Sequence, residues 1–71
     1  MNRFRPVKFD EISKKKQELF LEEISYIEKL IIKHLGEAET VHIALERLEE
    51  TMMWISKTIK HDQIDRIERR Y

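Results

Sequence analysis

An apolar stripe with helical spacing runs along the second half of this chain of 71 residues. Its members recur at steps of four, three, four, three and four: Val41, Leu45, Leu48, Met52, Ile55 and Ile59. This spacing places the six side chains along one side of an α-helix, where they must be buried against another surface. So short a chain can provide little more than one further helix to cover them.

A second apolar stripe comes earlier in the sequence and predicts the covering helix. Its members are also three or four residues apart: Phe20, Ile24, Ile27, Ile31 and Leu35. Gly36 follows directly, at a position where helices commonly end on glycine. Asp10 or Ser13 can cap the start of this helix, because a short polar side chain accepts a hydrogen bond from the first turn. Pro6 disfavours helix in the residue before it and marks an extended arm.

The sequence therefore predicts an all-α fold, in which a short N-terminal arm is followed by an antiparallel two-helix hairpin. The arm covers about residues 1–9, the first helix about residues 10–35, and the second helix about residues 38–61 or longer. Residues 1–71 form one helical-hairpin domain, since a chain of this length holds at most one core. The residues expected to close the hairpin from the second helix are Leu45, Leu48, Met52 and Ile55.

Self-association is expected, because a single core rarely stabilises so short a chain. The chain has no cysteine and no pair of histidines at metal-ligand spacing, so a disulfide or a structural zinc is not expected. Apolar residues also remain outside the one internal interface of a hairpin: Leu19, Leu21, Leu30, Ile32, Ile43, Met53 and Trp54. Met53 and Trp54 are expected to face another subunit of a homo-oligomer. The alternative is that a helix of a partner protein covers this surface.

Charge is segregated along the chain although the formal net charge is zero. Residues 1–20 carry +3 and residues 57–71 carry +2, and an antiparallel hairpin brings these segments to the same end. The half that contains the turn carries −5. The basic end, with the N-terminus of the first helix, is the predicted position of an anionic ligand. The alternative is a solvated surface with ordinary helical ion pairs, such as Lys14 with Glu18 and Arg47 with Glu50.

Several classes of function are not expected. A neutral chain has no overall field to attract DNA, RNA or an anionic membrane. No apolar run approaches the roughly 20 residues of a membrane span, and none follows the basic N-terminal residues as in a signal peptide. The expectation is a soluble, cytoplasmic protein. We also expect no enzyme, no catalytic residue, no metal and no cofactor, because neither a catalytic triad nor a glycine-rich phosphate loop has the required spacing.

The order of residues in the second helix resembles that of a known family. The pattern consists of Ala44-Leu45, Leu48-Glu49-Glu50, Met53-Trp54 and Ile59. It is similar to the pattern of the phage anti-CBASS sponge proteins of the second anti-CBASS type, whose helical hairpin also occurs in Thoeris-inhibiting phage sponges. Arg3-Phe4 resembles the Arg-Phe arm of that family. The resemblance covers about residues 3–61, and residues 44–59 carry its specific part.

The resemblance implies a compact homohexamer that binds cyclic dinucleotides and cyclic trinucleotides in separate pockets without hydrolysing them. Such a sponge withdraws the immune signal from its effector in the cytoplasm of the infected cell, and so blocks CBASS antiphage defence. A different class of function stays open, namely a small helical interaction module or inhibitor that docks its spare apolar surface on a host protein. A nucleic-acid binder is the third alternative, since the basic residues gather at one end of a neutral chain.

Ligand-binding residues are expected in the arm, at the start of the first helix and at the end of the second. They are Arg3, Phe4, Arg5, Pro6, Lys8, Lys16, Lys57, Lys60 and His61. Phe4 can stack on a base while the flanking arginines hold phosphate, or it can tether the arm to a neighbouring subunit. The resemblance implies dinucleotide binding near the arm and the first helix, and trinucleotide binding near Lys60 and His61.

Overall fold

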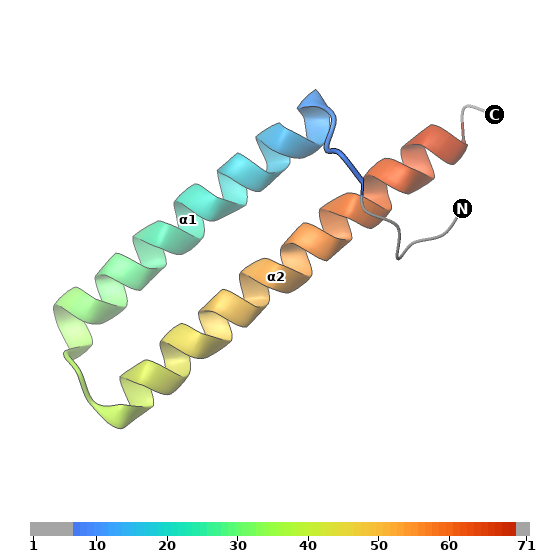
Figure 1. The fold of residues 1–71 in the computed structure, drawn as a ribbon. Coiled ribbons are helices and arrows are strands. Elements are labelled where there is room, and N and C mark those ends of the chain that lie inside the picture. Colours follow the sequence, from blue (N-terminus) through green and yellow to red (C-terminus); the bar gives the residue numbers. More distant parts are fainter. Residues whose placement is uncertain (1–6, 70–71) are drawn as a thin grey trace.

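The computed structural model describes residues 7–69 and contains two α-helices that lie side by side and run antiparallel (Figure 1). Helix α1 spans Glu11–Leu35 and helix α2 spans Glu39–Glu68. Since the described residues contain no strand, the predicted all-α helical hairpin is confirmed. Helix α2 has 30 residues against 25 in α1, and its C-terminal turns extend beyond the start of α1 (Figure 1).

Both ends of α1 have a local cause in the sequence. Asp10 is the N-cap, and its side chain accepts a hydrogen bond of 2.8 Å from the backbone N–H of Ser13. This bond satisfies one of the N–H groups that have no partner within the first turn. At the other end Gly36 has φ 78°, and its N–H bonds the carbonyl of Ile32 at 3.4 Å. Glycine adopts this φ without steric cost, so the chain can turn here toward α2.

The fully buried residues lie at the two ends of the helix pair, and most of them lie at the end where α1 begins. Val41 is buried near the turn, whereas Ile59 and Ile64 are buried near the C-terminus of α2. Ser13 and Gln63 are the buried polar residues in the described part of the chain, at 0% and 2% exposure. The hairpin is therefore held at the start of α1 by a mixture of apolar and polar contacts.

The middle of the hairpin is only partly covered. The residues expected to close it are half-buried: Leu45, Leu48, Met52 and Ile55. On α1, Ile24 and Ile31 are half-buried, whereas three other members of the predicted apolar stripe are exposed: Phe20, Ile27 and Leu35. Two helices share only one interface, so a single chain cannot cover the rest of these stripes.

A large apolar surface stays open in the single chain. Twelve large hydrophobic residues among residues 7–69 are exposed, of which Met53 and Trp54 reach 61% and 60%. Apolar surface of this extent is typical of a protein–protein contact. Neither helix, over its described residues, is long and apolar enough to cross a membrane.

Candidate functional site

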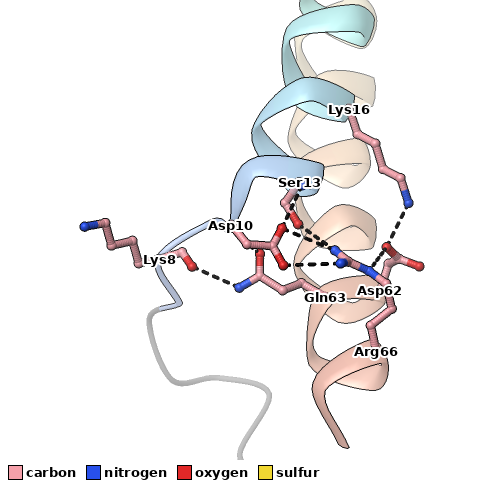
Figure 2. A network of polar contacts seen from close by, with 7 residues as sticks. All are labelled: Lys8, Asp10, Ser13, Lys16, Asp62, Gln63 and Arg66. Carbon is pink, nitrogen blue, oxygen red and sulfur yellow. Dashed lines mark hydrogen bonds and ion pairs between the residues drawn. The ribbon is translucent and has the colours of Figure 1, made fainter. Parts of the chain in front are cut away.

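The candidate site is the end of the hairpin where the segment before α1, the start of α1 and the end of α2 meet. We call it the arm end and define it as residues 7–16 and 57–69. Figure 2 shows the polar contacts that join its three segments. The side chains and backbone groups of this network belong to seven residues: Lys8, Asp10, Ser13, Lys16, Asp62, Gln63 and Arg66.

Gln63 binds the segment before α1 to helix α2 through both ends of its carboxamide. Its Oε1 accepts a hydrogen bond of 2.8 Å from the backbone N–H of Asp10. Its Nε2 donates one of 2.9 Å to the backbone carbonyl of Lys8. A buried amide is costly unless it is hydrogen-bonded, and here both the acceptor and the donor end have a partner. The backbone of residues 8–10 is thus fixed against α2.

Arg66 reinforces the same junction through charge. Its Nη1 and Nη2 donate to Oδ2 and Oδ1 of Asp10 at 3.2 and 3.4 Å, and Nη2 also donates to Oγ of Ser13 at 3.1 Å. This two-pronged contact matches the planar guanidinium to the carboxylate. The pKa of Asp10 is lowered, first by the backbone N–H of Ser13 and then by Arg66, while desolvation opposes the change. The pKa of Arg66 is raised, mainly by its bond to Asp10.

Asp62 lies between two cations at the arm end. Its Oδ2 accepts hydrogen bonds from Nζ of Lys16 at 2.9 Å and from Nε of Arg66 at 3.1 Å. The pKa of Asp62 is lowered, mainly by Lys16 and next by Arg66. Two cations therefore alternate with two carboxylates: Lys16, Asp62, Arg66 and Asp10 (Figure 2). This group carries no net charge, so it reduces the positive potential expected at this end.

Some of the predicted ligand-binding lysines are not paired in this way. No ion pair within residues 7–69 involves the ammonium group of Lys8 or Lys60. Lys8 is exposed, and its side chain points away from the polar network (Figure 2). Lys60 is half-buried and lies three residues before Gln63, on the same side of α2. The backbone contact of Gln63 thus holds Lys8 near the helical face that carries Lys60.

The other predicted ligand residues are distributed around this end. Lys57 lies over the ring of Trp54, with Nζ 4.7 Å from the ring centroid, which is a cation–π contact. His61 is exposed on α2. Lys16 is engaged by Asp62 as described above. The remaining predicted positions lie outside the described residues: Arg3, Phe4, Arg5 and Pro6.

The expected helical ion pairs are found in part. Arg47 and Glu50 pair at 2.9 Å, as predicted. Lys14 does not pair with Glu18 but lies 3.7 Å from Glu11, on the preceding turn. A carboxylate in the first turn also faces the positive end of the helix dipole, which favours Glu11 at that position.

Three residues of the network were missed by the sequence interpretation: Asp62, Gln63 and Arg66. A signal for them exists, because steps of three and four beyond Ile59 continue the apolar stripe of α2 onto these positions. Polar residues in an apolar register indicate a buried or partly buried hydrogen-bond network. Their partner segment, residues 8–13, could not be identified from the sequence.

A groove between the two helices lies in the acidic half of the molecule. Its floor includes Ile24, Leu45, Leu48 and Met52, and the carboxylates among its lining residues are Glu28, Glu46 and Glu49. Such a surface disfavours a phosphate ligand because of like-charge repulsion. Among the residues that the structure describes, no group of three or more His, Cys, Asp or Glu side chains could hold a metal ion.

Comparison with known proteins does not identify the chain. No protein-family model matches it, and neither a curated protein nor a solved structure does so.

Proposed function

We propose that this protein is a non-enzymatic sponge that sequesters cyclic di- and trinucleotide immune signals and so blocks CBASS antiphage defence in the cytoplasm of the host cell. The observation that carries the proposal is the residue order of residues 44–59, which resembles the anti-CBASS sponge family. These residues lie within one continuous helix of a two-helix hairpin, as the resemblance requires.

The chemistry of the ligand agrees with the arm end. A cyclic dinucleotide carries two phosphates and a cyclic trinucleotide three, each of which is matched by ammonium or guanidinium groups. Lys8 and Lys60 offer such groups without a carboxylate partner among residues 7–69. Arg5 in the arm and Lys57 on α2 add further positive charge in the proposal. Lys16 contributes less, because Asp62 already holds it.

Assembly completes the proposed pockets. One hairpin leaves Met53 and Trp54 exposed, and further copies of the chain cover them in the proposal. The resemblance implies a homohexamer. Closed symmetry repeats every arm end, so cations of neighbouring subunits can converge on the phosphates of one small cyclic ligand. No chemical step is needed, since binding alone withdraws the signal.

A ligand screen tests the proposal. The protein is titrated with 3′,3′-cyclic di-AMP, cyclic di-GMP, cyclic GMP-AMP and cyclic tri-AMP, with linear di-AMP as a control, by calorimetry and thermal melting. We expect at least one cyclic ligand to bind at micromolar concentration or below and to raise Tm. Heating the complex should release the ligand intact, as measured by mass spectrometry.

Lys60→Ala is the matched variant in the same screen. It should weaken binding of one class of cyclic ligand by about tenfold, as expected for loss of a charged phosphate contact, and leave the mass of the oligomer unchanged. If no cyclic ligand binds the unmodified protein at micromolar concentration, the sponge proposal is wrong.

A helical interaction module is the second candidate, because twelve large hydrophobic residues are exposed in the part of the chain that the structure describes. An apolar helical surface can cover a partner's helix as readily as another copy of itself. This candidate predicts a monomer or dimer that binds one host protein stoichiometrically and no cyclic ligand. The mass in solution and the ligand screen together distinguish the two candidates.

A further inference from the structure

Gln63 occupies a position where the helical pattern calls for an apolar residue. It is 2% exposed, and the other buried residues of α2 are aliphatic: Val41, Ile59 and Ile64. An apolar side chain there would bury more hydrophobic surface without the cost of desolvating an amide. The amide instead makes two specific backbone contacts, with the N–H of Asp10 and the carbonyl of Lys8. Both contacts serve to position the segment before α1.

The two backbone groups that Gln63 binds differ in how many other hydrogen bonds hold them in place. Asp10 is also held by Arg66 and by the N–H of Ser13, so its place is fixed by several bonds. The backbone of Lys8 has one hydrogen bond among those that join residues 7–69, and Gln63 donates it. Among the hydrogen bonds of residues 7–69, the backbone of Lys8 therefore depends on this single side chain.

Gln63 also attaches the Lys8 backbone to a defined side of α2. Lys60 lies one turn before Gln63 on the same side of α2, where side chains three residues apart are neighbours. Asp62 engages Lys16 and Arg66 instead, through bonds of 2.9 and 3.1 Å. The arm end thus contains a neutralised group of charges and two further lysines, Lys8 and Lys60, which come from segments distant in sequence. Gln63 joins these two segments.

We propose that Gln63 is a positioning residue for phosphate binding: it holds the Lys8 backbone against the side of α2 that carries Lys60, so that ammonium groups of both segments are available to one anionic ligand. This inference rests on the sponge function proposed above and adds a residue outside the stretch that resembles the family. The contribution of Gln63 is entropic. Without its bond to the Lys8 carbonyl, the ligand must order the segment itself and binds more weakly.

The test compares Gln63→Met with Gln17→Met, which changes the only other glutamine, a half-buried residue of α1. Methionine has a similar length and helix propensity but makes neither hydrogen bond. The probe is the cyclic nucleotide of the screen above that binds the unmodified protein most tightly. We expect Gln63→Met to weaken its binding about tenfold, with helix content and oligomer mass unchanged. Gln17→Met should bind like the unmodified protein.

A double-mutant cycle with Lys8→Ala separates positioning from a general loss of stability. If Gln63 acts through Lys8, then Lys8→Ala lowers affinity in the unmodified background and has little further effect beside Gln63→Met. Fully additive losses, or equal affinities of Gln63→Met and Gln17→Met, would overturn the inference. Should Gln63→Met not fold, Gln63→Glu replaces it, since a carboxylate keeps an acceptor for Asp10 and lacks the donor to Lys8.

The two proposals fail in different ways in this experiment. When the unmodified protein binds no cyclic nucleotide, the sponge function fails and the role of Gln63 fails with it. When the unmodified protein binds and the Gln63 variants bind equally well, only the role of Gln63 is refuted.

Discussion

At the scale of single residues, polar bonds as well as apolar packing hold the arm end together. Asp62 bonds Lys16 and Arg66, and Arg66 in turn bonds Asp10. A count of formal charges along the sequence assigns Lys16 and Arg66 to the basic end of the hairpin. In the structure, however, carboxylates pair with both cations and neutralise them. The proposed anionic ligand would find Lys8 and Lys60 without a carboxylate partner among residues 7–69, whereas at Lys16 it would have to compete with Asp62.

The charge network predicts acid sensitivity. The pKa values of Asp10 and Asp62 are lowered below their ordinary value of 3.8, so folding favours the charged carboxylates. Their stabilisation is fully present above the pKa of the unfolded chain and is lost as the pH falls through the lower pKa of the folded state. Tm should be nearly constant from pH 7 to pH 5 and decrease below about pH 4.

Asp62→Asn is the variant that checks this pH dependence by thermal melting. It removes one of the two carboxylates, so its Tm should lie below that of the unmodified protein at pH 7. The two proteins should converge as the pH falls through the lowered pKa of Asp62 and its carboxylate becomes protonated in the folded state as well. A difference in Tm that is the same at every pH contradicts the assignment.

At the scale of elements, the helix ends determine the hairpin. Asp10 starts α1 with a side-chain cap, whereas Ala38 starts α2 without a side-chain hydrogen bond. Gly36 is the one described residue with a positive φ, and it stands directly after α1. The reversal of the chain thus depends on a backbone conformation that L-amino acids with a side chain rarely adopt.

Gly36→Ala is expected to destabilise the hairpin by about 1–3 kcal/mol through backbone strain. Steric crowding is not the cause, because a Cβ at Gly36 would meet no atom within 4 Å. Urea denaturation measures the change in the free energy of unfolding. Glu37→Ala, in the same turn at a residue without positive φ, is the control and should change stability much less. Equal effects of the two substitutions would show that the strain explanation is wrong.

At the scale of the whole molecule, one hairpin buries too little of its apolar surface. Phe20 and Ile27 belong to the stripe that faces α2, and both are still more than two-fifths exposed. Trp54 lies on another side of α2, and its described ring contact is with Lys57. We propose that further copies of the chain bury both regions, as in the hexamer that the resemblance implies.

Trp54→Ala tests this assembly. A large aromatic residue at the centre of an interface commonly contributes about 2 kcal/mol or more, so the variant should dissociate at concentrations where the unmodified protein stays assembled. Sedimentation or mass photometry measures the change. Lys60→Ala, a substitution at the proposed ligand site, should keep the original mass. A monomeric unmodified protein, or an unchanged mass for Trp54→Ala, contradicts the proposed interface.

Parts of the candidate site could be predicted from the sequence, and others could not. Charge counts identified the end at which the cations gather, and helical spacing identified α1, α2 and the glycine between them. The pairing of Lys16 with Asp62 was not predicted, because it joins residues far apart in sequence. The same holds for Gln63, whose partners are backbone groups of Lys8 and Asp10 and leave no pattern of residue types.

The sequence by itself determined the two helices, both ends of α1, the start of α2 and their antiparallel order, but left open how far α2 continues beyond residue 61. Spacing, capping and the freedom of Gly36 are local properties, and they depend on residues within a few positions of one another. Only the tertiary structure decided which cations stay unpaired and how the segment before α1 is held. Those outcomes depend on distances between side chains and backbone groups of separate segments, which are set when α2 packs beside the start of α1.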